Sequence, residues 1–335
     1  MSAGIDNLEL LIGQDMSSST PELSVIVPMY NASDTIEVCL ESLLSQSMPD
    51  LEIVVVDDRS TDGCADKVDR LSRLDGRVRL IRLRANSGSG VARNAGLANS
   101  HGRYIGFSDS DDWIDGAAYA SLIDAADRHE AEIAICGIKT EWGNFKSSSL
   151  RYVYPVEQVL YGKQALRAFT RSIDWDVSMS AIVNNRVYRT DYLKEHLICF
   201  NETRNAQDNY FTFFALAHAT KTVLVPKVYY HYLQREGSIS HVFNEGYVDG
   251  LLAALKEILD RLISMNELPE FEGEFYSLLH RCLCASAKNM YTRTPSFERQ
   301  RELARYILRR SVDVFGFDSI LEYFDAEALH QMFLL

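Results

Sequence analysis

Three aspartates, Asp109, Asp111 and Asp112, directly follow the apolar run 104–107. Like charges at this spacing repel one another unless a cation joins them. Carboxylate oxygens suit a hard divalent cation, and Mg²⁺ typically takes one or two protein carboxylates together with water and substrate phosphates. The cluster therefore predicts a Mg²⁺ or Mn²⁺ site that holds a phosphorylated substrate. Taken by themselves, the three residues fit an acidic turn that caps the next helix equally well.

The first 115 residues alternate apolar runs with amphipathic segments. They predict strands at 23–28, 51–56, 78–83 and 104–107, and helices from a Ser33-Asp34 cap to about residue 46, at 63–73 and at 90–99. The fully apolar run 51–56 indicates a strand buried on both faces, as in a parallel sheet. The alternation predicts an α/β fold with a doubly wound, mostly parallel sheet and flanking helices.

Ligands bind at the carboxyl ends of the strands in such sheets. Three groups of polar or aromatic residues fall at these ends and are expected to form one site: Pro28 to Tyr30, Asp57-Asp58 and Asp109 to Asp111. The turn Gly88-Ser89-Gly90 suggests a phosphate cradle only weakly, because no GxGxxG or P-loop pattern is present.

Composition narrows the class of protein. The chain has 335 residues, enough for a full core and two lobes, with 47% apolar and 24% charged residues, as in ordinary soluble domains. A net charge of −13 argues against nucleic acid as a partner. The six cysteines lack metal-site spacing and are expected to be free, buried thiols in a reducing compartment. With neither a signal peptide nor a long apolar span in the sequence, a cytoplasmic protein is expected.

Four segments carry a family resemblance: 24–31 (SVIVPMYN), 55–63 (VVDDRSTDG), 92–96 (ARNAG) and 109–113 (DSDDW). In sequence, order and spacing they resemble the family 2 inverting glycosyltransferases. The strong motifs cover about residues 22–115 and weaker ones reach about residue 241. The resemblance implies a GT-A fold, a nucleotide-sugar donor that is usually UDP-linked, and a divalent metal.

The resemblance also implies roles for the donor-binding residues. The backbone near Pro28 and the ring of Tyr30 would pack around the nucleoside, since any base offers a π-face. Asp58 resembles the residue that accepts the N3–H of uracil, and an ionised carboxylate is purely an acceptor. Arg93 would meet the diphosphate or pair with the acidic edge. Arg59 stands where the family usually has Gly, which leaves the conformation of that turn open.

The acidic motif receives its roles from the same resemblance. Asp109 corresponds to the residue that touches ribose or metal, and Ser110 lies beside it in the donor site. Asp111 corresponds to the direct metal ligand, while Asp112 is expected behind the other two.

The catalytic base is expected downstream, in the segment 207–211 (QDNYF). Asp208 keeps the register of the family's base, although Gln207 replaces the usual Glu. A positioned Asp can accept the proton of an acceptor hydroxyl as that proton becomes acidic in the transition state. The alternative reading of Asp208 is a helix N-cap.

The segment 228–240 resembles the one that closes over the diphosphate. His231 is a candidate metal ligand, although a packed strand residue remains the alternative. Arg235, Ser238 and Ser240 would donate to phosphate oxygens.

The expected organisation is a flexible tail (1–20), a nucleotide-sugar-binding half (21–115), an acceptor-binding half (116–241) and a C-terminal helical region (242–335). Five arginines of the last region lie close together: Arg299, Arg301, Arg305, Arg309 and Arg310. This basic segment suits a solvated face, the inner face of a membrane, packing on the catalytic domain, or a homodimer.

The predicted function is metal-dependent, inverting transfer of a hexosyl or N-acetylhexosaminyl group. The donor is a UDP-sugar, and the acceptor is a hydroxyl of a glycan or lipid-linked molecule in cell-surface polysaccharide synthesis. One alternative is a GT-A-like nucleotidyltransferase, which would need a Gly-rich basic loop after the first strand that 29–32 lacks. The other is a non-catalytic nucleotide-sugar-binding protein, and the presence of Asp111 and Asp208 argues against it.

Overall fold

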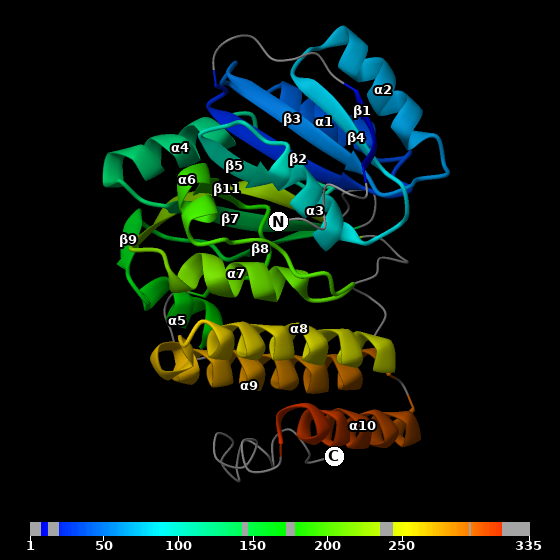
Figure 1. The fold of residues 1–335 in the computed structure, drawn as a ribbon, viewed down its shortest axis with the longest axis vertical. Helices are drawn as coiled ribbons and strands as arrows, with labels where there is room; N and C mark the ends of the chain where they lie inside the picture. The colour runs from blue at the N-terminus through cyan, green and yellow to red at the C-terminus, as the bar shows by residue number, and fades with distance from the viewer. Residues whose placement is uncertain are drawn as a thin grey trace.

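One mixed sheet lies at the centre of the molecule (Figure 1). The computed structural model describes residues 8–12, 20–142, 147–171, 178–234, 244–294 and 296–316. Within these residues the sheet has 11 strands in the order β1-β4-β3-β2-β5-β10-β7-β11-β6, with β8 beside β7 and β9 beside β11. The strands are β1 (Leu8–Ile12), β2 (Leu23–Met29), β3 (Leu51–Asp57), β4 (Val78–Leu83), β5 (Tyr104–Phe107), β6 (Trp113–Ile114), β7 (Ile133–Trp142), β8 (Ser147–Arg151), β9 (Gln158–Tyr161), β10 (Arg186–Arg189) and β11 (Lys221–Gln234).

Four parallel strands, β4-β3-β2-β5, form the half of the sheet that the sequence predicts. Strands β4 and β5 begin and end at the predicted residues, and every residue of β2 and β3 is buried. The first helix begins at Ile36, so the predicted Ser33-Asp34 cap is wrong. The amide of Ser33 instead donates to Asp62 across the loop before α2, at 2.8 Å.

Helices cover both faces of the sheet, as expected for a doubly wound fold. Val25 and Val27 point into the core shared with α1 and α4, whereas Ile26 points into the core that includes α7, because side chains alternate along a strand. The helices are α1 (Ile36–Leu44), α2 (Cys64–Leu74), α3 (Ser89–Ala98), α4 (Ala118–His129), α5 (Gln164–Thr170), α6 (Thr190–Glu195), α7 (Gln207–Ala217), α8 (Glu245–Ser264), α9 (Leu268–Arg293) and α10 (Phe297–Phe315).

The second half of the sheet is mixed. Strand β10 lies between β5 and β7 and is antiparallel to both, while β7 and β11 form a long parallel pair. One continuous sheet therefore spans both predicted halves, and their division near residue 115 stays a prediction. Residues 8–12 form β1, antiparallel to β4, so the predicted flexible tail over 1–20 is wrong for this segment. Strand β1 thus pairs with backbone groups of β4 that would otherwise lie unpaired at the edge of the sheet.

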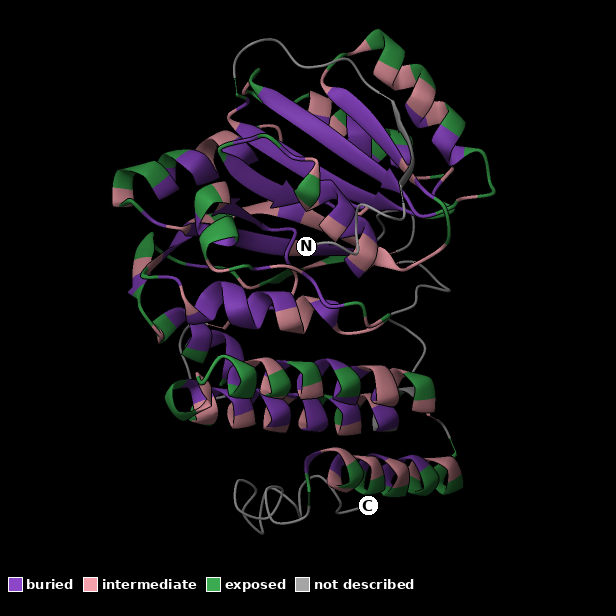
Figure 2. Cartoon of the chain, viewed as in Figure 1, coloured by how far each residue is buried: buried purple, intermediate pink, exposed green. Residues whose placement is uncertain are grey.

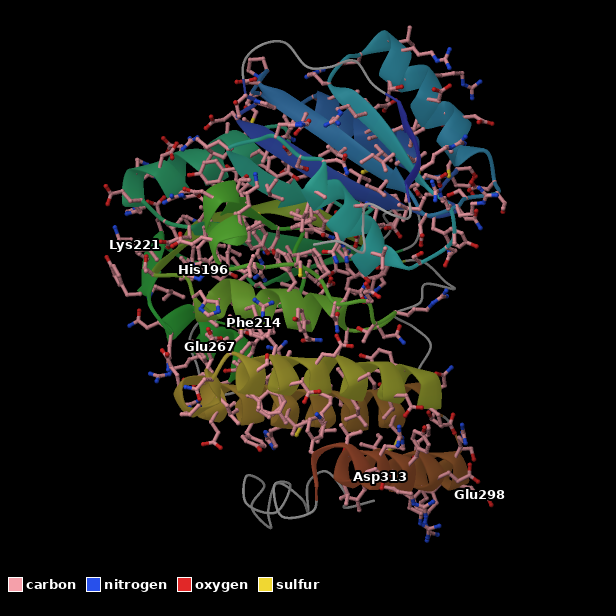
Figure 3. The ribbon with its side chains drawn as sticks, in the orientation of Figure 1. His196, Phe214, Lys221, Glu267, Glu298 and Asp313 are labelled. Atoms are coloured by element: carbon pink, nitrogen blue, oxygen red, sulfur yellow. The ribbon has the colours of Figure 1, made fainter. Side chains whose placement is uncertain are left out.

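Beyond the sheet, α7, the pair α8 and α9, and then α10 follow one another (Figure 1). Their buried residues form stripes along each helix (Figure 2), as the helical spacing in the sequence predicts. Phe214 of α7 (Figure 3) is fully buried. The guanidinium of Arg261 on α8 lies 4.0 Å from the centre of its ring. This contact fixes α7 against the helical region. Among the described residues, no helix is both long and apolar enough to cross a membrane.

The arginines of the basic segment on α10 differ in their contacts. Arg299 pairs with Glu245, and Arg310 pairs with Asp249 at 3.0 Å, so these two hold α10 on α8. Three others, Arg301, Arg305 and Arg309, are exposed. Packing on the rest of the chain therefore accounts for part of the basic segment.

All six cysteines are free and lie within the described residues. Cys199 and Cys284 are partly exposed and the other four are buried. The expectation of buried thiols is therefore confirmed for four of the six and wrong for two.

The turn after β3 shows what happens where the family usually has Gly. Arg59 has a φ of 68°, in the left-handed region that costs most residues about 1–2 kcal/mol. We expect Arg59→Gly to be about 1 kcal/mol more stable to urea unfolding than Arg59→Ala. Both variants remove the same side-chain contacts, so the comparison isolates the backbone. Equal stability of the two variants would show that the turn is not strained.

Candidate active site

The carboxyl ends of β2, β3 and β5 carry the predicted donor residues. Pro28 is buried within β2, while the ring of Tyr30 just beyond it is 51% exposed and has a face open to a ligand. Asp58 follows β3 and is buried, whereas Asp109 follows β5 and its side chain is 33% exposed. The parallel sheet therefore gathers these residues at one edge, as predicted.

Arg93 joins two carboxylates that are distant in the sequence. One terminal nitrogen, Nη2, donates to Asp109 Oδ1 at 2.8 Å, and the other, Nη1, donates to Asp208 Oδ1 at 3.0 Å. The guanidinium is almost completely buried and lies 5.2 Å from the centre of the Phe200 ring. Of the two predicted roles of Arg93, the structure places it in the ion pair with the acidic edge. The candidate metal carboxylate and the candidate base therefore share one arginine.

Asp208 is the second residue of α7, so it lies inside the helix and is not its N-cap. Burial raises the pKa of Asp208 above its ordinary value, Arg93 lowers it, and Asp109 raises it further. A carboxylate with a raised pKa is a stronger proton acceptor near neutral pH. The role of Asp208 as the general base stays a prediction, and its raised pKa supports that prediction.

The glycine-rich turn before α3 binds a carboxylate of the chain itself. Ser87 N donates to Asp58 Oδ1 at 2.7 Å and Gly88 N donates to Oδ2 at 2.8 Å. Gly88 has a φ of +94°, which favours glycine at this position. Burial raises the pKa of Asp58, and these two amides oppose that effect. Since a carboxylate has about four acceptor positions, Asp58 can still accept one more donor.

Asp112 and Tyr230 hold the acidic loop after β5 in place. Asp112 is fully buried and accepts hydrogen bonds from the Tyr230 hydroxyl and, at 2.8 Å, from Leu233 N. Burial, followed by the charges of Asp109 and Asp111, raises the pKa of Asp112 well above its ordinary value. Asp112 thus shapes the loop, while Asp109, Ser110 and Asp111 remain partly exposed.

The donor set for a metal ion is small. Among the described residues, no three His, Cys, Asp or Glu side chains are grouped so as to hold a metal. Asp109 binds Arg93 through one oxygen, and Asp111 is partly exposed. One or two carboxylates completed by diphosphate and water form an ordinary Mg²⁺ shell, so these two residues fit such an ion.

His231 has other partners in this structure. Its Nδ1 lies 3.2 Å from Glu141 and its Nε2 lies 3.1 Å from Asp115, and its ring stacks on Trp113 at 5.0 Å. Both nitrogens therefore face carboxylates other than Asp109 and Asp111. A metal-ligand role for His231 stays a prediction. Three further predicted donor residues, Arg235, Ser238 and Ser240, lie outside the described residues.

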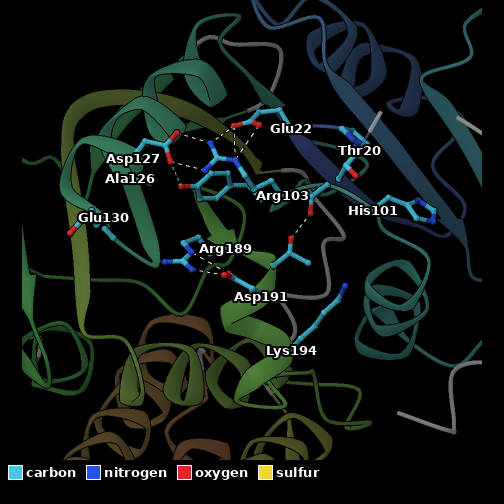
Figure 4. Close-up of a pocket in the computed structure, with 15 residues that line it drawn as sticks. Thr20, Glu22, His101, Arg103, Ala126, Asp127, Glu130, Arg189, Asp191 and Lys194 are labelled. Atoms are coloured by element: carbon cyan, nitrogen blue, oxygen red, sulfur yellow. Dashed lines mark hydrogen bonds and ion pairs between the residues drawn. The ribbon is translucent and has the colours of Figure 1, made fainter. Parts of the chain in front are cut away.

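A cavity of about 650 Å³ lies at the opposite ends of β2 and β5 (Figure 4). Arg103 crosses it and pairs with Glu22 and Asp127. None of the predicted site residues lines this cavity.

Sequence reasoning gave no role to several residues that shape the site. Asn94 binds the backbone of Phe200, Ser89 accepts a hydrogen bond from Gln207, and Asn184 Nδ2 donates to the Tyr230 hydroxyl at 2.9 Å. The signals in the sequence were the position of Asn94 within the 92–96 motif and that of Ser89 within the glycine-rich turn 88–90.

Known proteins share much of this sequence and fold. Residues 24–197 match the family described as Glycosyl transferase family 2. The succinoglycan biosynthesis protein ExoO of Rhizobium meliloti (strain 1021) is 32% identical over 246 residues, which are 72% of this chain and 69% of ExoO. The putative glycosyltransferase EpsH of Bacillus subtilis (strain 168) is 29% identical over 276 residues, 79% of this chain and 76% of EpsH.

Among solved structures, S. aureus TarS 1–349 in complex with UDP-GlcNAc is similar with a TM-score of 0.69 at 24% identity. The match covers 88% of this chain and 81% of that 1–349 chain. This likeness confirms the predicted GT-A type fold with a C-terminal helical region. The family match and the relatives confirm the predicted enzyme class. The chain belongs to glycosyl transferase family 2 and is a glycosyltransferase.

Proposed function

We propose that the protein transfers a sugar from a UDP-sugar to an acceptor hydroxyl with inversion at the anomeric carbon. The observation that carries this proposal is the Arg93 bridge, which holds Asp109 and Asp208 at one site. A transferase needs a donor-side carboxylate and an acceptor-side base close together. Membership of family 2 disfavours the nucleotidyltransferase and the non-catalytic binding protein considered from the sequence.

In the proposed reaction the acceptor hydroxyl attacks the anomeric carbon of the donor. The bond from that carbon to the diphosphate oxygen breaks, and UDP leaves with the bonding electrons. Asp208 Oδ2 takes the hydroxyl proton, because Oδ1 is bound to Arg93. Attack opposite to the leaving group inverts the configuration. Arg93 contributes positive charge beside the base and the acidic edge.

We further propose that Asp111 and Asp109 hold Mg²⁺ or Mn²⁺ against the diphosphate. A bound cation would neutralise charge on the leaving group. Asp111→Asn is expected to remove most of the activity and most of the Mn²⁺-dependent gain in UDP affinity, with the fold intact. Calorimetric titration of UDP in Mn²⁺ and in EDTA measures this gain. Equal wild-type affinity in both buffers would contradict a metal-dependent donor site.

Asp58 is proposed to read the nucleotide by accepting the N3–H of uracil. Cytosine presents a lone pair at that position, which a carboxylate repels. Loss of a hydrogen bond to a charged group costs about 1.5–3 kcal/mol, or about 10- to 150-fold in affinity. Thermal shifts with UDP, CDP and GDP in Mn²⁺, followed by calorimetry, test this, since ligand binding raises apparent stability.

Tighter binding of CDP or GDP than of UDP would overturn the donor assignment. Full preference for UDP in Asp58→Ala would show that another group reads the base. The exclusion of GDP is weaker, because guanine also carries an N–H at the corresponding position and only its size excludes it.

For the acceptor, we propose a glycan or lipid-linked molecule of the cell surface. The names of the relatives support this class: ExoO is a succinoglycan biosynthesis protein, and TarS of Staphylococcus aureus is a poly(ribitol-phosphate) beta-N-acetylglucosaminyltransferase. We also propose that the protein acts in the cytoplasm, that it contacts the inner face of the membrane, and that it forms a homodimer. Sedimentation with anionic vesicles tests the contact, and light scattering tests the dimer.

A further inference from the structure

Helix α3 touches three of the predicted site carboxylates. The residues before it, Ser87 and Gly88, hold Asp58, and Arg93 in its middle holds Asp109 and Asp208. The element that connects the nucleotide carboxylate to the base is therefore α3. How accurately it places Asp208 depends on the contact between α3 and the segment 200–207 that leads into α7.

Asn94 makes that contact through a reciprocal pair of hydrogen bonds. Its Nδ2 donates to Phe200 O at 2.8 Å, and its Oδ1 accepts from Phe200 N at 2.8 Å. The two residues are 106 positions apart in the sequence. One side chain thus satisfies both backbone groups of Phe200 and fixes this residue against α3.

Phe200 in turn contacts Arg93 and also Phe211, which lies on the same helix as Asp208. Its ring stacks on Phe211, one helical turn after Asp208, with centres 4.2 Å apart and planes at 13°. Arg93 lies over the same ring. A displacement of Phe200 would therefore move the base, its helix and its cationic partner together.

The segment lies directly against α3. A Cβ on Gly90 would come within 2.6 Å of Asn201 O, so glycine permits this approach. Gln207, the residue before the base, donates to Ser89 Oγ in the first turn of α3. Both contacts keep the segment where Asn94 can clamp it.

We propose that Asn94 is a positioning residue for the catalytic base, acting through Phe200 to set Asp208 against Arg93 and the donor site. The inference rests on the proposed function, because it takes Asp208 as the base. The side chain of Asn94 bonds to the backbone of Phe200, and its effect on turnover passes through Asp208.

The first test is UDP release from UDP-N-acetylglucosamine, with water as acceptor, by Asn94→Ala. We expect kcat to fall about 10- to 100-fold, because misplacement by about 1 Å can cost about 10²-fold, while the donor KM changes less than about twofold. Asn99→Ala is the matched control: Asn99 closes the other end of α3, where its Nδ2 donates to Ala95 O at 2.8 Å. An equal kcat loss in both variants would reduce Asn94 to a structural role and overturn the inference.

A double-mutant cycle separates the inference from the proposed function. If Asn94 acts through Asp208, Asn94→Ala in the Asp208→Asn background should lower kcat no further, since residues that act as a unit are not additive. Full additivity would overturn the positioning role. Wild-type kcat in Asp208→Asn alone would instead overturn the base assignment.

A measurement without turnover completes the test. Backbone hydrogen exchange over 200–211 should quicken in Asn94→Ala and stay unchanged in Asn99→Ala. Unchanged exchange over 200–211 in Asn94→Ala would overturn the inference, even if UDP-N-acetylglucosamine is not the donor.

Discussion

Asp208→Asn is expected to lower kcat by about 10²–10⁴-fold and to leave donor affinity nearly unchanged. The amide keeps the shape of the side chain and can still accept from Arg93 Nη1, so the fold and the donor site should persist. It cannot take the proton of the acceptor hydroxyl. Because a base acts mainly in the transition state, the loss should appear in kcat. Steady-state UDP release and calorimetric UDP titration measure the two quantities.

Asp191→Asn provides the matched control. Asp191 is the second residue of α6, pairs with Arg189, and lines the cavity at the opposite ends of the strands. It should keep wild-type kcat. If Asp208→Asn retained more than about a third of wild-type kcat with chemistry rate-limiting, another residue would have to be the base.

The local part of the fold could be predicted from the sequence. Tyr104–Phe107 is an apolar run, and four of the six residues of Val78–Leu83 are apolar; the limits of both strands in the structure are the predicted ones. Such strands are encoded by their own residues. Strand β10 is different: it has four residues, two of them arginines, and it is held by β5 and β7 from distant parts of the chain. Tertiary pairing decided its structure, and no local pattern indicated it.

The same distinction applies to the site. The aspartates at the strand ends were found because motif and topology place them at one edge. Pairing of Arg93 with the acidic edge was one of its predicted roles. Its second partner Asp208 and the Phe200 partner of Asn94 were not predicted, because they lie 115 and 106 residues away from these side chains. Nor does a glycine-rich turn reveal which anion its amides bind. The turn suggested a phosphate only weakly, and in the structure Ser87 N and Gly88 N bind the Asp58 carboxylate.

Arg93→Met is expected to destabilise the protein by about 3 kcal/mol near pH 7.5, because removing one partner of a buried ion pair leaves the opposite charges without a counterion. Arg93 is 3% exposed, while the side chains of Asp109 and Asp208 keep 33% and 31% exposure, which places the loss at the low end for buried pairs. Without the guanidinium, the charge of Asp109 repels that of Asp208, and the pKa of Asp208 rises further above its ordinary value.

The sign of the pH dependence follows from that rise. Groups whose pKa is higher in the folded state favour folding at low pH, and this contribution is lost as pH increases through the folded-state pKa. The loss of folding stability in Arg93→Met relative to wild type should therefore be largest at neutral pH and shrink towards pH 4.5. Urea unfolding at both pH values measures it. A deficit that grew on acidification would contradict the Arg93 bridge.

The pH dependence of activity distinguishes loss of this ion pair from a general loss of stability. Since Arg93 lowers the pKa of Asp208 and burial raises it, removing Arg93 should move the acid limb of kcat/KM to higher pH. Arg79→Met is the control: Arg79 is also buried and pairs with Glu52 at 2.9 Å, at a site apart from the carboxyl-end cluster. It should lose comparable stability and keep the acid limb of the wild type. An unmoved limb in Arg93→Met would mean that the group titrating in catalysis is not Asp208 beside Arg93.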